Sequence, residues 1–237
     1  MTPTGYASFS PRIRTASRKA GRLLDEIRAI SDAPEVAYVR QKVAAGLGDA
    51  ILKARHLVGD EPFGVLLPDD LVDAPTPCLK QMIEVFERYR TSVVAIERVE
   101  RKAVSRYGVI KGRLVRDGTL SGRLYRIEDM VEKPPPEQAP SNLPIIGRYI
   151  LTPAVFGELV AITPGAGGEI QLTDALRRLL SKEPIYGLMF NGKRYDAGDK
   201  LGFLMATAEM ALKRADLGES FWRYLKSLKY PLKMRTP

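Results

Sequence analysis

Short apolar runs and helical apolar spacings alternate along most of this chain. Continuous apolar runs, which are typical of buried β-strands, fall at residues 63–67, 92–96 and 185–190. Apolar residues three or four positions apart predict amphipathic helices around these runs, at 18–30, 46–57, 79–90, 170–180 and after a polar cap at Asp199. Strands that alternate with helices predict an α/β fold whose sheet is mainly parallel and flanked by helices.

One stretch departs from this alternation. Residues 107–151 are strand-like and contain glycines, without an obvious helical pattern. We expect them to form an inserted antiparallel segment or the far side of the sheet. Residues 36–39 predict a further short strand. The dipeptide Thr152-Pro153 predicts the capped start of a helix, with the threonine as cap and the proline in the first turn.

The composition bounds the class of protein. With 237 residues, 45% of them hydrophobic, the chain can bury one sizeable core. We therefore expect one domain over residues 18–237, preceded by a basic, disordered segment at 1–17. No apolar run approaches the roughly 20 residues of a membrane span, which argues against a membrane partner. Cys78 is the only cysteine, which excludes an internal disulfide and favours a reducing, cytoplasmic setting.

Charge and histidine content narrow the chemistry further. His56 is the only histidine, with no cysteine near it, which argues against a metal cluster or a Cys–His couple. The net charge of +9 is concentrated at the two ends and favours anionic partners such as phosphates, nucleic acid or acidic lipid. Basic residues are not interleaved with aromatic ones, and no zinc-finger or helix-turn-helix signature occurs. We therefore interpret the basic ends as solvated segments and expect no nucleic-acid partner.

Carboxylates and a lysine remain as the candidate chemical groups. Asp69 follows an apolar strand and Asp196 lies between a strand and a helix, at the sheet edge where α/β proteins bind ligands. Mg²⁺ prefers one or two carboxylates together with substrate phosphates. Glu132 can accept hydrogen bonds from sugar hydroxyls, and Lys133 can pair with a phosphate. Taken singly, each of these residues is better explained as part of an ordinary turn, a helix cap or a surface ion pair.

Several motifs nevertheless occur together in one order. They are Gln41 with Gly46-Leu47-Gly48-Asp49-Ala50, Leu67-Pro68-Asp69-Asp70, Tyr107-Gly108-Val109-Ile110, Val131-Glu132-Lys133-Pro134, Ser141-Asn142-Leu143-Pro144-Ile145-Ile146-Gly147-Arg148-Tyr149, Gly168-Glu169-Ile170-Gln171-Leu172-Thr173-Asp174-Ala175 and Tyr195-Asp196-Ala197-Gly198-Asp199-Lys200-Leu201-Gly202. This ordered set resembles the bacterial UTP–glucose-1-phosphate uridylyltransferases over about residues 18–230. The resemblance implies a Rossmann-like mixed sheet. It also implies transfer of a uridylyl group from UTP to glucose 1-phosphate, which gives UDP-glucose and pyrophosphate.

The same resemblance implies roles for individual residues. The positions that contact the uracil are Gln41 and Gly46. The positions that hold Mg²⁺ are Asp69 and Asp196. The positions that contact glucose are Gly108, Glu132, Gly147 and, less closely matched, Asp70. Lys133 matches the lysine that meets the sugar phosphate, and it is the residue expected to be catalytic.

The chain departs from the family's pattern at one point. The G-x-G-T-R loop that holds the triphosphate in this family does not occur in the 237 residues. Because the resemblance begins near Arg18, we expect a truncated nucleotidyltransferase domain that lacks its first strands and turns over slowly. The alternative is a non-catalytic UDP-sugar-binding or regulatory homologue. Members of the family commonly form dimers or tetramers, so the resemblance implies a homo-oligomer.

Overall fold

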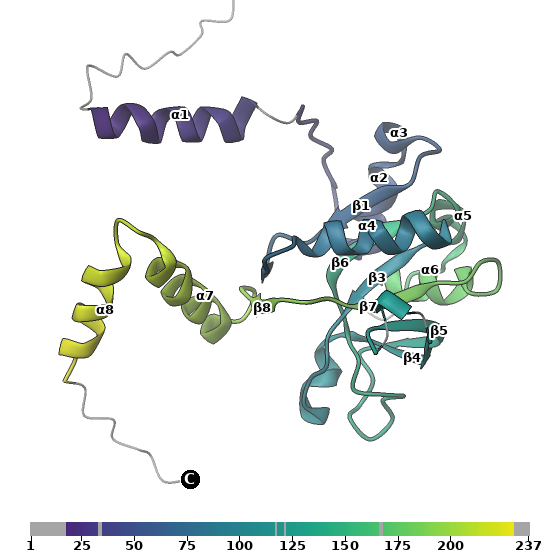
Figure 1. The fold of residues 1–237 in the computed structure, drawn as a ribbon. Helices are drawn as coiled ribbons and strands as arrows, with labels where there is room; N and C mark the ends of the chain where they lie inside the picture. The colour runs from purple at the N-terminus through teal and green to yellow at the C-terminus, as the bar shows by residue number, and fades with distance from the viewer. Residues whose placement is uncertain (1–17, 33–34, 117, 121, 166–167, 230–237) are drawn as a thin grey trace, which may run out of the picture. The chain divides into compact units, whose positions relative to one another are not determined.

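The computed structural model describes residues 18–32, 35–116, 118–120, 122–165 and 168–229, and the chain divides into two compact units, Met1–Arg40 and Gln41–Pro237. The first unit contains α1 (Arg18–Asp32), the helix that the apolar spacing predicts (Figure 1). The segment expected to be disordered, 1–17, lies outside the described residues.

The prediction of a strand at residues 36–39 is wrong. Residues 35–40 are irregular and form no ladder with any part of the chain that the structure describes. Val36 is 60% exposed and Tyr38 is 93% exposed. A strand needs a neighbour to accept and donate its backbone hydrogen bonds, so local β-propensity alone does not produce one.

The second unit is built on a mixed, six-stranded sheet (Figure 1). In chain order its strands are β1 (Phe63–Leu66), β3 (Val93–Ile96), β4 (Gly108–Leu114), β5 (Leu124–Glu132), β6 (Ile145–Leu151) and β7 (Tyr186–Met189). In space they are ordered β1-β6-β3-β7-β5-β4. The predicted α/β class, with helices flanking a mixed sheet, is therefore confirmed.

Parallel pairing is less frequent than the sequence predicts. Only β3 and β7 are parallel neighbours, whereas the other adjacent pairs in this sheet are antiparallel. The strands β1, β3, β4 and β7 still share one direction. The reason is that β5 and β6, which come from the predicted antiparallel segment, insert between them and run the opposite way.

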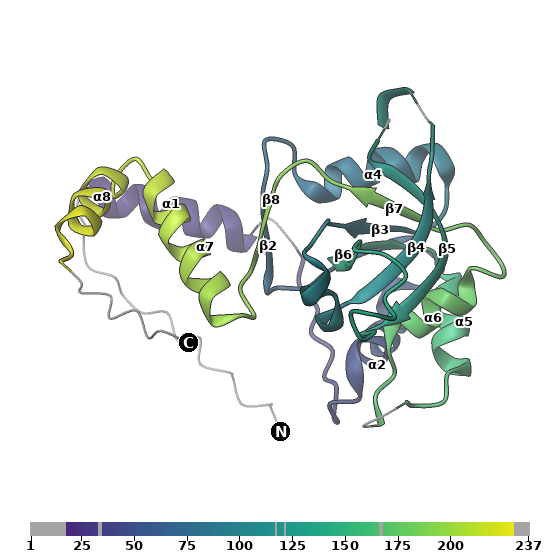
Figure 2. The same cartoon turned by 90° about the horizontal axis from the view of Figure 1, so that it is seen from below.

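Helices cover both faces of this sheet, as Figure 2 shows. One face packs on α4 (Cys78–Tyr89), and the other packs on α2 (Gly46–Lys53), α5 (Ala154–Ala161) and α6 (Leu172–Leu179). The central strand β3 contributes to both layers because successive side chains point to opposite faces. Val93 and Ala95 pack with α4, while Val94 and Ile96 pack with α5 and α6, and all four are fully buried.

A small two-stranded sheet carries the polar residues of interest. It pairs β2 (Asp70–Asp73) with β8 (Lys193–Asp196), and neither strand is predicted because each has only four residues and no continuous apolar run. Next come α7 (Lys200–Lys213) and α8 (Gly218–Ser227), while the short α3 (Arg55–Val58) follows α2. The predicted cap is confirmed, since Asp199 Oδ2 accepts hydrogen bonds from the backbone of Leu201 and Gly202 at 3.1 Å each. In the described residues, no helix has the length and apolar content to cross a membrane.

The start of α5 differs from the prediction. Thr152 does not cap the helix, because its hydroxyl donates to Glu183 at 2.7 Å instead. Pro153 occupies the N-cap position and makes no side-chain cap. Glu183 also accepts a hydrogen bond from Ser92 at 2.9 Å, so Thr152 joins a polar contact beside β3.

Replacing Leu159 by alanine should destabilise the protein strongly. Its side chain is fully buried in α5, so the change leaves a cavity that costs about 2–5 kcal/mol. The neighbouring Val160, which is 62% exposed, provides the matched control, and Val160→Ala should change stability by less than about 1 kcal/mol. Urea unfolding measures both values, and equal losses would contradict this assignment of the core.

Glu158 should make stability depend on pH. It is 2% exposed and pairs with Lys182 at 2.5 Å and Arg178 at 2.9 Å. The Lys182 ammonium, helped by Arg178, holds the pKa of Glu158 below its usual value. A lowered carboxyl pKa stabilises the fold above the unfolded-state value of about 4.3, and this stabilisation is lost as pH falls through the folded-state pKa.

Glu158→Gln should therefore cost most stability near neutral pH, and the difference from wild type should shrink below about pH 4. Thermal unfolding from pH 3 to pH 8 measures this difference. The exposed Glu84 of α4 serves as the control, because Glu84→Gln should give a small difference that hardly changes with pH. A pH-independent loss for Glu158→Gln would show that packing, not charge, dominates.

Candidate functional site

A cleft of about 530 Å³ lies where several strands of both sheets end. Its floor and walls come from the residue after β1, the carboxyl ends of β5 and β8, and the first residues of β4 and β6. The predicted site residues that line it are Gly46, Asp69, Asp70, Gly108, Glu132, Lys133, Gly147 and Asp196. Gln41 is not one of the lining residues.

Gly108 and Glu132 form one wall of the cleft. They are direct partners in the β4–β5 ladder. A Cβ atom at Gly108 would lie 2.5 Å from Thr173 Oγ1 and 3.1 Å from Glu132 Oε2. Glycine therefore leaves a carboxylate and a hydroxyl open beside the same backbone. An acceptor next to a hydroxyl is suited to binding the hydroxyl groups of a sugar.

Lys133 follows in an unusual backbone conformation. Its φ of 43° is left-handed, which non-glycine residues adopt only at some energetic cost. The conformation is held by the Lys133 N–H, which donates to the Tyr107 carbonyl at 3.0 Å. The ammonium lies 3.7 Å from Glu132 Oε1, and the side chain is 57% exposed. A lysine held at the rim of the cleft in this way can reach an anionic group of a ligand.

Asp69 and Asp196 converge over Gly198. A Cβ atom at Gly198 would lie 3.0 Å from Asp69 Oδ2 and 3.3 Å from Asp196 Oδ1. The Ala197 N–H also donates to the Asp69 carbonyl at 2.7 Å, which ties the two segments together. Within the described residues no group of three or more His, Cys, Asp or Glu side chains forms a metal cluster. Two carboxylate oxygens are a donor set that would suit Mg²⁺, which prefers one or two carboxylates together with substrate phosphates.

The other oxygen of Asp196 is held by the protein. Asp196 Oδ2 accepts a hydrogen bond from the Tyr107 hydroxyl at 2.8 Å and from Arg106 at 3.0 Å. Burial raises the pKa of Tyr107, so its hydroxyl stays a donor. These bonds engage Oδ2, so Oδ1 is the Asp196 oxygen that lies near Gly198.

Asp70 is buried between two partners. Its Oδ2 accepts the Gly147 N–H at 2.7 Å, and its Oδ1 accepts a hydrogen bond from Arg194. Asp70 is only 6% exposed, so it supports the backbone at Gly147 more directly than it presents an oxygen to a ligand. Nearby, burial raises the pKa of Tyr149, with the Glu132 and Asp70 carboxylates adding to the effect.

Gln41 does not line the cleft but bonds to Gly46, which does. Its amide nitrogen donates to the Gly46 carbonyl at 3.1 Å and to Asp49 at 2.7 Å. Gly46 has a φ of +90°, and a Cβ atom there would lie 2.8 Å from the Ile170 carbonyl. The structure thus brings together the predicted pair Gln41 and Gly46 and shows why residue 46 is glycine.

Several lining residues carry no role in the sequence prediction. Among them are Arg106, Tyr107, Thr173 and Arg194. Tyr107 and Thr173 lie inside the quoted motifs, so their neighbours provide a signal. Arg194 and Asp196 stand two residues apart on one strand, which places them on the same face, but this relation is visible only once β8 is known.

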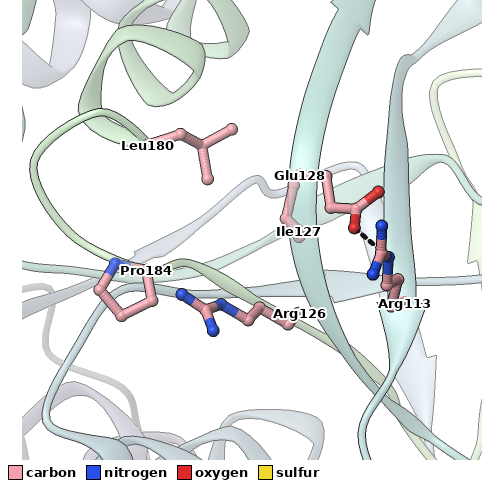
Figure 3. A pocket seen from close by; sticks show the side chains of 6 residues that line it. All are labelled: Arg113, Arg126, Ile127, Glu128, Leu180 and Pro184. Carbon is pink, nitrogen blue, oxygen red and sulfur yellow. Dashed lines mark ion pairs between the residues drawn. The ribbon is translucent and has the colours of Figure 1, made fainter.

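Another hollow, of about 420 Å³, is a further candidate (Figure 3). Its lining residues are Arg113, Arg126, Ile127, Glu128, Leu180 and Pro184. Figure 3 shows Arg113 directed at Glu128, with which it forms an ion pair. The hollow offers neither convergent carboxylates nor a glycine beside a ligand wall, so the larger cleft is the better candidate.

Comparison with known proteins agrees with this geometry. The profile of a family described as nucleotidyl transferase matches residues 11–213. The chain belongs to this family. The resemblance that the ordered motifs indicate is confirmed, and with it the class of enzyme, a nucleotidyltransferase.

Relatives of known name are similar over most of the chain. The UTP–glucose-1-phosphate uridylyltransferase YngB of Bacillus subtilis is 44% identical over 205 residues, which are 86% of this chain and 67% of the relative. A second B. subtilis protein of that name is 40% identical over 225 residues, 94% of this chain and 75% of the relative. One from Staphylococcus saprophyticus is 44% identical over 207 residues, 87% and 70% of the two chains.

Solved structures show the same relation. A UDP-glucose pyrophosphorylase complexed with UDP-glucose has a TM-score of 0.77 at 46% identity and covers 84% of this chain and 74% of its own. The UTP-bound enzyme from Acinetobacter baumannii has a TM-score of 0.75 at 32% identity and covers 89% and 73%.

Gly147→Ala should disrupt the cleft. The added methyl would lie 2.4 Å from Asp70 Oδ2 and 2.6 Å from Leu67 Cβ, so buried atoms must move. We expect a loss of about 1–3 kcal/mol in the free energy of unfolding. Gly157 in α5 has room for a methyl group, with nothing within 4 Å, and Gly157→Ala should gain about 0.5–1 kcal/mol. Urea unfolding distinguishes the two, and a neutral Gly147→Ala would contradict the tight contact.

Proposed function

We propose that the cleft binds UDP-glucose and that the chain transfers a uridylyl group from UTP to glucose 1-phosphate. The observation that carries this proposal is the convergence of two aspartates with the pair Glu132 and Lys133 in one cleft. The aspartates offer a site for Mg²⁺, and the pair offers a carboxylate for sugar hydroxyls with a cation for the adjoining phosphate. The relatives named for this reaction support the same assignment.

The reaction needs little acid–base chemistry. A phosphate oxygen of glucose 1-phosphate attacks the α-phosphorus of UTP, a new O–P bond forms, and the bond to pyrophosphate breaks. The nucleophile is largely ionised at neutral pH, since its second pKa is about 6. The barrier arises from repulsion between anions, so positioning and charge neutralisation dominate.

The residues of the cleft divide this work. Lys133 would pair with the sugar phosphate, and Glu132 would accept hydrogen bonds from glucose. Gly108 and Gly147 would let the sugar approach the backbone, while Gln41 and Gly46 would shape the uracil site. Asp69 and Asp196 would hold Mg²⁺, which supplies further neutralisation of phosphate charge when bound.

A second candidate is a UDP-sugar-binding homologue without turnover. The observation that favours it is that Glu132 and Lys133, which line the cleft, are groups suited to holding a sugar and its phosphate, and Gln41 bonds to Gly46 beside them. Binding through these residues does not by itself require turnover.

We also propose that the protein is cytoplasmic and that it forms a homo-oligomer. Cys78 is buried and is the only cysteine, which suits a reducing cytoplasm. A homo-oligomer would cover apolar side chains of α7, since Leu201, Phe203 and Leu204 are 65%, 56% and 63% exposed.

Binding and turnover should be measured on the same preparation. Calorimetry with UDP-glucose, with and without Mg²⁺, should show saturable binding, and UTP with glucose 1-phosphate should release pyrophosphate. Lys133→Met should lower kcat/KM about 10²-fold or more, because it removes a charge beside the reacting phosphate. The exposed Lys111 of β4 is the control, and Lys111→Met should leave both measurements unchanged.

Each outcome decides between the candidates. Binding with Mg²⁺-dependent pyrophosphate release supports the transferase. Binding without release supports the non-catalytic homologue. The absence of binding with either nucleotide would overturn both.

A further inference from the structure

Arg194 is a buried cation that the proposed reaction does not use. Its side chain is 7% exposed although it lines the cleft. It forms an ion pair with Asp70 and lies 3.5 Å from Glu97 and 3.6 Å from Asp196. A guanidinium has five donors in a fixed fork, so one side chain can serve several carboxylates at once.

On the side of the cleft proposed to bind the sugar, Arg194 contacts Asp70, which in turn bonds to Gly147. Its Nε donates to Asp70 Oδ1, while Asp70 Oδ2 accepts the Gly147 N–H at 2.7 Å. Arg148 adds bonds to the carbonyls of Leu67 and Gly147, both at 2.8 Å. The position of the Gly147 backbone therefore depends on a carboxylate that Arg194 neutralises.

On the side of the cleft proposed to bind the metal, Arg194 contacts both Tyr107 and Asp196. Its Nη1 donates to the Tyr107 hydroxyl at 3.4 Å, and its guanidinium lies 5.1 Å from the centre of the tyrosine ring. The same hydroxyl donates to Asp196 Oδ2 at 2.8 Å. The Tyr107 hydroxyl proton is thus committed to Asp196, whereas the guanidinium of Arg194 reaches both Asp70 and Asp196.

We propose that Arg194 is a positioning residue shared by the two halves of the cleft, holding Asp70 for the sugar and Asp196 for the metal. Tyr107 is its partner on the metal side alone. This inference rests on the proposed function, because it assumes that the two halves bind a nucleotide sugar and a divalent cation.

The physical reason is the charge that the cleft must hold. Asp70, Glu97 and Asp196 would repel one another in a partly desolvated site, and burial raises the pKa of Glu97 despite the Arg194 cation. Asp70 and Asp196 are direct partners in the β2–β8 ladder, so their side chains start close together. Without the guanidinium these two carboxylates would share no cation, and their side chains would turn away from each other. Partners that orient metal-binding carboxylates typically contribute about 10–100-fold to metal affinity.

Two binding probes separate the halves. UDP-glucose without metal, measured by calorimetry, reports the sugar side. Mn²⁺ without nucleotide, measured by paramagnetic resonance, reports the carboxylates Asp69 and Asp196. Arg194→Met should weaken both probes about 10-fold or more, whereas Tyr107→Phe should weaken Mn²⁺ about 10-fold and leave UDP-glucose within about two-fold.

Three controls isolate the effect. Lys193 precedes Arg194 on β8 but pairs with Glu209, so Lys193→Met should leave both probes unchanged. Met82→Ala destabilises the core under α4 and should also leave both affinities unchanged once folded protein is counted. Arg194→Lys keeps the positive charge but replaces the planar guanidinium with a single ammonium group, which cannot reach Asp70 and Asp196 together. The affinity for at least one probe should therefore fall.

The outcomes are distinguishable. If wild type binds neither probe, the proposed function fails and this inference fails with it. If wild type binds both and folded Arg194→Met keeps either affinity within two-fold, only this inference is overturned. If Arg194→Met does not fold, Arg194→Lys decides, and retention of both affinities within two-fold overturns the inference.

Discussion

Mutual repulsion among carboxylates is the constraint around which the cleft is organised. Asp70, Glu97 and Asp196 arrive from three separate segments and meet at the guanidinium of Arg194. Such groups can stay ionised near one another only where a cation and hydrogen-bond donors offset the loss of water. The fold supplies that cation from the interior, which leaves the outward-facing oxygens over Gly198 available to a ligand.

The main sheet makes this arrangement rigid. Its central strand β3 is buried on both faces, and Glu97 follows directly after that strand. Glu132 ends β5, and the Asp69 segment follows β1. Side chains at the ends of packed strands are held in fixed positions because the core beneath them is closely packed. The loops that follow these strands can vary more in sequence and length.

Periodicity predicted the parts of the fold that depend on apolar burial. The strands β1, β3 and β7 and the helices α4 and α6 follow from it because their side chains fill the two core layers. The small β2–β8 sheet could not be found in this way, since each strand has only four residues and charged side chains interrupt its apolar positions. The error at residues 36–39 has the converse cause, because β-propensity was present without a neighbouring strand to pair with.

The candidate site was predictable only in part, because some of its residues lie in no motif. Asp69, Glu132 and Asp196 stand at recognisable motif positions, whereas Arg194 has no motif of its own and acts through contacts distant in sequence, as with Asp70 124 positions away.

The left-handed backbone of Lys133 has an evolutionary consequence. Glycine is the residue that adopts this conformation most easily, and β-branched residues adopt it worst. Selection for low backbone strain alone would therefore favour glycine at position 133. Selection for a positive charge in the cleft favours lysine. A descendant that no longer handled phosphates would be free to accept glycine there, so the identity of this one residue can serve as a historical marker of whether a lineage kept its chemistry.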